Sequence, residues 1–355
     1  MNKVALILPG SLWYAPYVRI YTRILDAEKV EYSIISWNRE GDDRPEGFQY
    51  DVRCANGHGS AGLSAYRGYI KFIKRTIKEN DFNRIIVFGP QMTCLLSAYL
   101  LVHFRKRYMI DYRDLSIEQK PGFKQLFSLM LKLSRVNVIS SPGFKRCLPK
   151  RDYYLSHNFD ENAVRNTLEN RSNESSFCTQ NGIDVLTIGA IRDYSSNIEV
   201  TKALANQEGF TLRFVGRGQG TVEKLQAYCD EVNAINVSFV GGYDKPEEAG
   251  YVKTSTVMNI FYPRKITHDT ALSNRFYNSL IYRKPMIVTK ATVQGDYAEK
   301  YNVGVAVTDC SNLTNVLKDF LHQDYQDYCN RCDKLLLEFL NDQQEFVNAV
   351  CYFIK

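Results

Sequence analysis

Short apolar runs and amphipathic segments alternate along most of the chain. Residues 4–8 form a continuous apolar run, and a Pro-Gly-Ser turn connects them to an amphipathic segment that starts near Tyr14. Apolar runs of this length are typical of parallel strands that are covered on both faces. The repeated order of strand, turn and helix therefore predicts an α/β fold built from doubly wound sheets.

The apolar runs fall into two series. The first series predicts strands at 4–8, 32–37, 84–88, 107–111 and 136–140. The second series predicts strands at 184–188, 211–215, 237–240, 257–262, 286–289 and 303–307. The polar stretch 162–181 separates the two series and is expected to be a linker. We therefore expect two Rossmann-like domains that face a cleft, residues 1–163 and 164–342.

Several connecting segments are expected from the same pattern. A long loop should cover 38–62, and a basic loop should cover 263–269. The apolar spacing predicts the following helices: one over 91–105, and three near the end of the chain that start at about 313, 324 and 343.

A helix is expected directly after Ser273, which is a suitable N-cap. Apolar residues recur there at helical spacing: Leu272, Phe276, Tyr277, Leu280 and Ile281. Pro285 ends the helix, because the residue before a proline is pushed out of the α region. Asn274 and Arg275 open it, where free N–H groups, the helix dipole and a guanidinium together suit a phosphate. A core helix with a solvated arginine is an equal alternative.

This stretch resembles the donor-site helix of GT-B glycosyltransferases, especially the retaining family 4 type. The match consists of Asn274, of Arg275 in place of the family's lysine, and of Lys284-Pro285 with the strand that follows. The resemblance implies that the second domain binds a nucleotide-diphosphate sugar, and that the first domain binds a glycan or lipid-linked acceptor. It also implies that no metal or other cofactor is needed, and that a final helix, about 343–355, packs back on the first domain.

The sequence departs from the family at three positions. The family's ribose-binding glutamate is replaced by Asn278, and a second glutamate eight residues earlier is replaced by Thr270. The family's glycine before the lysine is replaced by Arg283. Asn278 is expected to face the ribose as a neutral substitute, since an amide both donates and accepts hydrogen bonds.

The resemblance also assigns site residues outside the central helix. Arg192, which follows Gly189 at the end of a strand, is expected to clamp the donor diphosphate together with Arg275. The other expected donor-binding residues are Gly10, Gly189, Gly216, Tyr243, His268, Asn274 and Asn278. For Gly10, a glycine that simply makes the turn is an equal alternative. Gly216 opens a GRGQG run, whose spacing is not that of a dinucleotide-binding fingerprint.

Asp114 is the expected catalytic residue of the first domain. It follows the strand 107–111, and similar enzymes place this region near the transferred sugar or the acceptor. Asp114 could orient or deprotonate an acceptor hydroxyl. The alternative is an Asp–Arg pair that stabilises the loop.

The composition limits the expected location and binding partners of the protein. A net charge of +6 suits phosphate-bearing substrates or an anionic membrane surface and does not require nucleic acid, so no nucleic-acid partner is expected. Nine scattered cysteines, an odd number, indicate reduced thiols and a cytoplasmic location. Cys329 and Cys332 stand alone, and we interpret them as structural. Pro9 and Gly10 cut the first apolar run too short for a signal peptide.

The segment 120–135 alternates lysines with large apolar residues. Such a helix could lie on the inner face of an anionic membrane, or it could cover the core with a solvated basic edge. Together with the two-domain layout, the resemblance implies a glycosyltransferase of cell-surface polysaccharide biosynthesis that retains the anomeric configuration. Two alternatives stay open: a GT-B-fold sugar-nucleotide epimerase or phosphorylase-like enzyme, and a non-catalytic protein that binds a sugar nucleotide or a partner.

Overall fold

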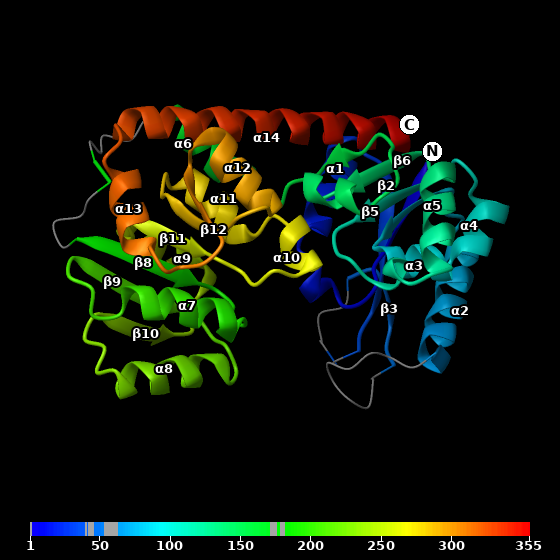
Figure 1. The fold of residues 1–355 in the computed structure, drawn as a ribbon. Helices are drawn as coiled ribbons and strands as arrows, with labels where there is room; N and C mark the ends of the chain where they lie inside the picture. The colour runs from blue at the N-terminus through cyan, green and yellow to red at the C-terminus, as the bar shows by residue number, and fades with distance from the viewer. Residues whose placement is uncertain (1, 40, 42–45, 53–62, 171–175, 178–181) are drawn as a thin grey trace. The chain divides into compact units, whose positions relative to one another are not determined.

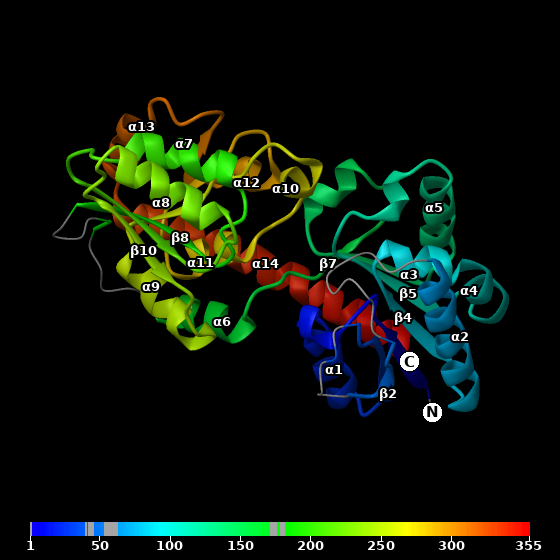
Figure 2. The ribbon, with the colours of Figure 1, turned by 90° about the horizontal axis from the view of Figure 1, so that it is seen from below.

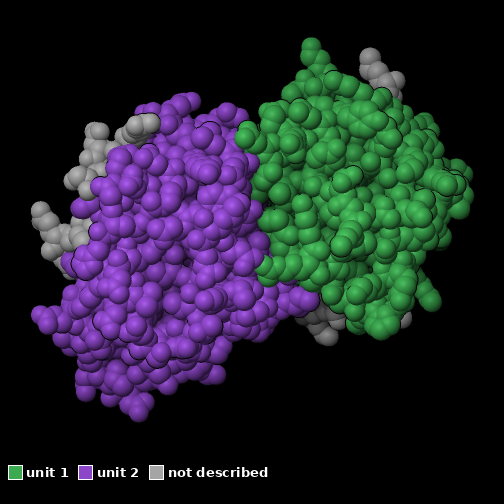
Figure 3. Space-filling view, turned by 45° about the horizontal axis from the view of Figure 1, so that its top comes forward, with its two compact units in different colours: residues 1–157, 341–355 green, residues 158–340 purple. Residues whose placement is uncertain are grey.

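The computed structural model describes residues 2–39, 41, 46–52, 63–170, 176–177 and 182–355. These residues form two compact units (Figure 3). The first unit consists of residues 1–157 with 341–355, and the second of residues 158–340. The chain therefore passes from one unit to the other twice.

The first unit is built on a seven-stranded sheet in the order β3-β2-β1-β4-β5-β6-β7, in which every pair is parallel. Its strands are β1 Lys3–Ile7, β2 Glu31–Trp37, β3 Phe48–Tyr50, β4 Arg84–Phe88, β5 Tyr108–Tyr112, β6 Val136–Ile139 and β7 Tyr154–Leu155. The strand order reverses between β1 and β4, and ligands bind in such sheets beyond the carboxyl ends of the strands at that switch point.

Helices cover both faces of this sheet (Figures 1 and 2). One face, which includes Ile7 and Val87, packs against α2 Leu63–Glu79, α3 Pro90–Leu95, α4 Ser97–His103 and α5 Phe123–Leu133. The opposite face, which includes Leu6 and Ile86, packs against α1 Val18–Ala27 and the end of α14 Tyr325–Ile354. Successive strand residues thus enter different cores, as the side-chain alternation of a strand requires. Three short 3₁₀ helices complete the unit: η1 Leu12–Tyr14, η2 Ile117–Gln119 and η3 Pro142–Arg146.

The second unit contains a six-stranded parallel sheet in the order β10-β9-β8-β11-β12-β13. Its strands are β8 Ile183–Ile188, β9 Phe210–Val215, β10 Val237–Gly241, β11 Val257–Ile260, β12 Met286–Thr289 and β13 Gly304–Val307. Its helices are α6 Glu161–Glu169, α7 Tyr194–Leu204, α8 Thr221–Glu231, η4 Lys245–Glu247, α9 Glu248–Thr254, α10 Ile266–Thr270, α11 Asn274–Ile281, α12 Val293–Tyr301, α13 Leu313–Leu321 and the first part of α14 Tyr325–Ile354. The prediction of two Rossmann-like α/β sheets is confirmed.

The central helix α11 forms as the sequence predicts. The Ser273 hydroxyl accepts a hydrogen bond from the backbone N–H of Phe276, as an N-cap does. The apolar face, including Phe276 and Leu280, is fully buried. Beyond the helix, Arg283 adopts the left-handed conformation with φ 50°, and it forms an ion pair of 2.9 Å with Asp333. A glycine suits this backbone position, and here the buried ion pair holds an arginine in it.

Several connecting segments differ from the sequence prediction. The expected linker 162–181 begins with α6, because Asp160 caps it by accepting from the N–H groups of Asn162 and Ala163. The expected loop 263–269 contains the short helix α10, and the expected loop 38–62 contains the edge strand β3. Most of the rest of that loop lies outside the described residues.

Helix continuity was also predicted incorrectly in two places. The expected helix 91–105 is divided into α3 and α4 at Leu96. Conversely, the two helices expected from about 324 and 343 form one continuous helix, α14, because no glycine or proline interrupts residues 325–354. Its last residues, including Phe346, Val350 and Phe353, are buried in the core of the first unit. Helix α12 was not predicted.

Candidate functional site

Backbone hydrogen bonds join three loops at the carboxyl edge of the second sheet. The backbone N–H of Gly189, after β8, donates to the carbonyl of Val215, and Gly216, after β9, donates to the carbonyl of Gly241 at the end of β10 (2.9 and 2.6 Å). Gly216 has φ 141°, and a Cβ added there would lie 1.9 Å from the Gly189 carbonyl oxygen. Only glycine therefore permits these two loops to approach so closely.

Two arginines stand on these loops without a partner. Arg192 and Arg217 are exposed, and within the described residues neither guanidinium forms a hydrogen bond or an ion pair. Their loops are joined by a hydrogen bond of 3.0 Å from the Ile191 N–H to the Arg217 carbonyl. The arrangement leaves two uncompensated positive charges on adjacent loops, which suits an anionic ligand.

Arg275 reaches the same loops from the start of α11. Its guanidinium donates to the carbonyls of Ile188, Ala190 (2.9 Å) and Asn259 (3.5 Å), at the ends of β8 and β11. The side chain is only 8% exposed. Arg275 is therefore not the solvated arginine that the sequence left as an alternative. It is a buried cation that holds two strand ends together and, among the described residues, has no carboxylate partner.

Glu248 is the acidic centre of a neighbouring network. Its carboxylate accepts hydrogen bonds from the Tyr243 hydroxyl (2.6 Å), from the Asn278 amide (2.8 Å) and from the Lys245 ammonium group (2.6 Å). Burial acts to raise the pKa of Glu248, but these three hydrogen bonds outweigh it and hold the pKa below its ordinary value. Two expected donor-binding residues, Tyr243 and Asn278, are thus oriented by a carboxylate that no sequence motif indicated.

The cations of the 263–269 segment are paired. Lys265 and His268 lie 2.9 and 3.3 Å from the carboxylate of Asp193, and the guanidinium of Arg264 binds Asp269 at 2.9 Å. His268 also stacks on the Tyr262 ring with 5.0 Å between ring centroids. These contacts dock α10 beside the loop that carries Arg192.

The remaining residues of the resemblance have clear local partners. The side-chain Oδ1 of Asn274 accepts a hydrogen bond from the side-chain amide of Asn158 at 2.9 Å. Thr270 is buried, and its hydroxyl donates to the Ile266 carbonyl at 2.7 Å, within α10. Thr270 therefore closes a helical turn, whereas Asn274 lies at the exposed start of α11.

A buried cluster follows β5 in the first unit. The carboxylate of Asp111 accepts from the Tyr21 hydroxyl (2.6 Å) and from the guanidinium of Arg113 (2.9 Å). Asp114 is exposed and forms no part of this pair. Although its side chain is accessible, the surrounding protein displaces part of the water around the carboxylate and raises the pKa of Asp114. Nearby Arg113 opposes this shift, and Asp111 reinforces it. The Asp–Arg pair that stabilises the loop exists, but Asp111 provides its carboxylate, and Asp114 stays open to a ligand.

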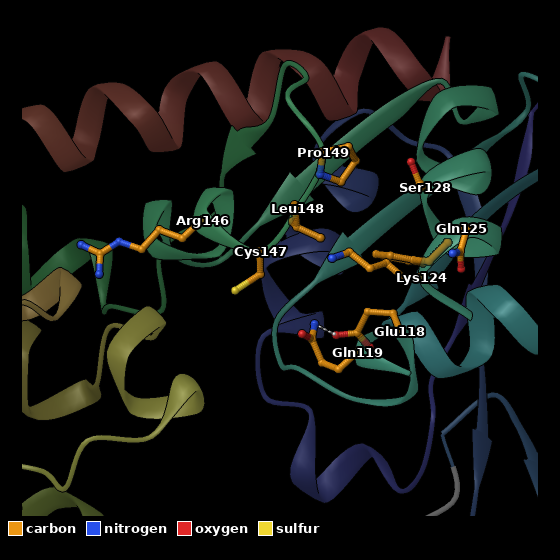
Figure 4. Close-up of a pocket in the computed structure, with 10 residues that line it drawn as sticks. Glu118, Gln119, Lys124, Gln125, Ser128, Arg146, Cys147, Leu148 and Pro149 are labelled. Carbon is orange, nitrogen blue, oxygen red and sulfur yellow. Dashed lines mark hydrogen bonds between the residues drawn. The ribbon is translucent and has the colours of Figure 1, made fainter. Parts of the chain in front are cut away.

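Two cavities of the first unit have different characters. One, of about 240 Å³, lies at the ends of β1 and β4 and includes Gly10 in its lining. The other, of about 690 Å³, lies between α5 and the segment 146–149 (Figure 4). In that second cavity Glu118 already accepts from the Tyr112 hydroxyl and the Gln119 amide (2.7 and 2.9 Å), and Arg146 points away from the other labelled side chains.

The structure brings most of the predicted donor residues to one edge of the second sheet: Gly189, Arg192, Gly216, Tyr243, His268, Asn274, Arg275 and Asn278. Gly10 and Asp114 belong to the first unit. Sequence reasoning missed Arg217 and Glu248. The glycines on both sides of Arg217 were a usable signal, but nothing in the sequence indicated Glu248.

Groups that could hold a metal are absent from the described part of the chain, where no three His, Cys, Asp or Glu side chains converge. Cys329 and Cys332 are buried in α14, and burial raises the pKa of the Cys332 thiol to about 12. The burial of both side chains agrees with the interpretation of Cys329 and Cys332 as structural residues.

Comparison with solved structures identifies the fold. The chain is similar to Anabaena HepE in complex with UDP, with a TM-score of 0.65 and 12% identity over 99% of this chain and 100% of that one. It is also similar to the lipopolysaccharide outer core galactosyltransferase WaaB (0.66, 13%, 99% of each chain). A third similar structure is sucrose-phosphate synthase from Thermosynechococcus elongatus (0.63, 14%, 98% of this chain and 100% of that one).

These similarities define the class of fold. The chain has the GT-B fold, with two Rossmann-like domains. No protein-family model matches the sequence, and no curated protein matches it either.

Proposed function

We propose that this protein is a glycosyltransferase that moves a sugar from a nucleotide-diphosphate sugar to a glycan or lipid-linked acceptor. One observation carries the proposal: Arg192, Arg217 and Arg275 lie on or reach two hydrogen-bonded loops at the carboxyl edge of the second sheet, and among the described residues none has a carboxylate partner. Three uncompensated cations at this edge suit a diphosphate. The GT-B fold supports the same function, because similar structures include a galactosyltransferase and a protein bound to UDP.

The proposed chemistry depends on charge at the leaving group. When the glycosidic bond breaks, the diphosphate gains negative charge, so fixed guanidinium groups stabilise the transition state more than the bound substrate. Asp114 would orient the acceptor hydroxyl or accept its proton. By resemblance we propose retention of configuration, and a role in cell-surface polysaccharide biosynthesis.

Ligand binding tests the proposal directly. A thermal-shift panel of nucleoside diphosphates and sugar nucleotides should reveal at least one ligand that raises Tm, because only a ligand that binds the folded state does so. Nucleoside monophosphates serve as the control, since they lack the second phosphate. If no diphosphate raises Tm more than its monophosphate, the proposed donor site is wrong.

A non-catalytic sugar-nucleotide-binding protein is the second candidate. The burial of Thr270 favours it, because this side chain closes a turn of α10 and does not offer a group to a ligand. Product analysis with and without a mixture of acceptors distinguishes the candidates. A glycosylated product identifies a transferase, an altered sugar nucleotide identifies an epimerase, and an unchanged donor that still raises Tm identifies a binding protein.

Asn278→Ala is expected to weaken nucleotide binding about tenfold. The Asn278 amide donates to Glu248, and its remaining carbonyl oxygen can accept from a ribose hydroxyl. Isothermal titration with the best diphosphate from the panel measures the change. Asn315→Ala, on the exposed side of α13, provides a matched control. Unchanged affinity in Asn278→Ala would place this residue outside the ribose site.

A peripheral membrane contact is proposed for α5. Phe123 and Leu129 are exposed on this helix, and so are Lys124 and Lys132. None of the helices in the described ranges has the length and apolar character needed to cross a bilayer.

The seven described cysteines are free thiols, which supports the proposed cytoplasmic location.

Vesicle sedimentation should therefore depend on lipid charge. Vesicles with an anionic lipid should carry down the protein at low salt and release it at high salt, because the attraction is screened. Lys124→Gln with Lys132→Gln should reduce the bound fraction, and Lys71→Gln with Lys78→Gln, on α2, is the control. Equal recovery with neutral and anionic vesicles would contradict the proposal.

A further inference from the structure

The small cavity of the first unit lies at the switch point of its sheet. It is lined by Pro9, Gly10, Ser11, Tyr14, Ala15, Tyr17, Arg39 and Gln91, which follow β1, β2 and β4. A Cβ added at Gly10 would meet no atom within 4 Å, so the glycine leaves this part of the cavity open. Among the described residues that line it, Arg39 has the one basic side chain and none has an acidic side chain.

Arg39 is held rigidly at this cavity. Its Nη2 group donates to the Pro9 carbonyl (2.6 Å) and to the Tyr66 hydroxyl (3.0 Å). Its guanidinium lies 4.2 Å from the centroid of the Trp37 ring, which is fully buried. The Trp37 indole N–H in turn donates to the Val52 carbonyl at 2.9 Å. The positive charge is therefore preorganised and loses little conformational freedom when it binds a ligand.

The charge of Arg39 is not neutralised by the described residues. It forms no ion pair, and Nε is buried without a hydrogen-bond partner. Nη1 also donates to none of these residues. Other arginines of this unit differ, since Arg19 is paired with Glu46 and Arg113 with Asp111 (2.5 and 2.9 Å). An unpaired, partly desolvated guanidinium gains most from an anionic oxygen group.

Two aromatic side chains line the same cavity, and a third precedes one of them in the chain. Tyr14 and Tyr17 line it, and Trp13 and Tyr14 are 62% and 57% exposed on η1. Exposed aromatic faces offer apolar surface to the C–H face of a sugar ring, while Ser11 and Gln91 offer hydrogen bonds to its hydroxyls. The cavity thus combines a fixed cation with groups that suit a saccharide.

We propose that this cavity binds an acidic acceptor saccharide, whose carboxylate or phosphate group is held by Arg39. The inference rests on the proposed glycosyltransferase function and specifies its acceptor. The planar guanidinium of Arg39 would bind the charged group and so select for it. The aromatic side chains of the cavity would contact the sugar ring that bears this group.

Three probes that share one ring test the proposal: D-glucose, D-glucuronate and D-glucose 6-phosphate. Saturation-transfer NMR with the full chain should give a Kd for at least one acidic sugar about tenfold or more below that of glucose. Comparison of glucuronate with the phosphate identifies the acidic group. Arg39→Gln should abolish the preference, and Arg39→Lys should retain part of it, because the charge remains and the fork is lost. Arg105→Gln, an exposed arginine before β5, should bind like the parent protein.

The remaining outcomes separate this proposal from the proposed function. Equal binding of glucose and both acidic sugars would overturn it, as would an unchanged preference in Arg39→Gln. Inorganic phosphate that binds as tightly as the acidic sugars would show an anion site without saccharide selectivity and would also overturn it. UDP binding, measured on every variant, should stay unchanged. If UDP and the other nucleoside diphosphates fail to bind the parent protein, the donor site is wrong, whatever the sugars do.

Discussion

Arg192→Ala is expected to lower turnover about 10²-fold with the true donor, by analogy with the removal of one preorganised donor from a transition-state site. The Arg192 side chain is exposed and has no partner among the described residues, so the free energy of unfolding should not change. Arg192→Lys should recover activity only partly, because a lysine cannot bind two phosphate oxygens in one plane. Steady-state kinetics and chemical denaturation measure the two effects separately.

Arg275→Ala is expected to lower turnover by a similar factor and to destabilise the protein as well. Arg275 differs from Arg192, because it is buried and donates to three backbone carbonyls. Its removal leaves the strand-end carbonyls of Ile188 and Ala190 without that donor, which costs about 1–3 kcal/mol for each buried group. Arg165→Ala, on the exposed surface of α6, is the control for both variants. Near-normal activity in the Arg192→Ala, Arg275→Ala double variant would refute the donor site and its mechanism.

Gly216→Ala should destabilise the second unit by about 3 kcal/mol or more. The new Cβ would lie 1.9 Å from the Gly189 carbonyl oxygen, and φ 141° is a conformation that residues other than glycine rarely adopt. Relief of this contact requires the loops after β8 and β9 to separate, which also moves Arg192 and Arg217 apart. The free energy of unfolding, measured by denaturant titration, and the affinity for nucleoside diphosphates should therefore both fall.

A matched glycine provides the control for that variant. Gly250 lies within α9, and a Cβ added there would meet no atom within 4 Å. Gly250→Ala should stabilise the protein by up to about 1 kcal/mol, since alanine restricts the unfolded chain and favours the helix. If Gly216→Ala proves as well tolerated as Gly250→Ala, the close packing of the two loops is not required.

Local sequence signals predicted the elements that contain them. β12 and α11 form where the pattern places them, because the N-cap, the helical spacing and Pro285 all act within a few residues. Helix α10 was missed because four of its five residues have polar side chains, which give no apolar period. α12 was missed because only part of its short span faces the core.

Site geometry was harder to predict, because partners distant in the sequence determine it. The sequence indicated Arg275 as a candidate because it is the first cation of α11. Its burial, however, depends on carbonyls at the ends of β8 and β11. Asn278 was expected to face a ribose, and the carboxylate that orients it, Glu248, lies thirty residues earlier on another helix. Such contacts follow from strand order, which the sequence pattern does not determine.

The path of α14 has a consequence for folding during synthesis. One face of the first sheet is completed by Phe346, Val350 and Phe353, and the chain reaches these residues only after all of the second unit has been made. The part of this face that α14 covers therefore stays exposed while about 180 residues are added, at a rate of about 5–20 residues per second. The second unit is contiguous in the sequence and is complete at residue 340, before residues 341–355 of the first unit are made, so the later-made unit is able to finish folding first.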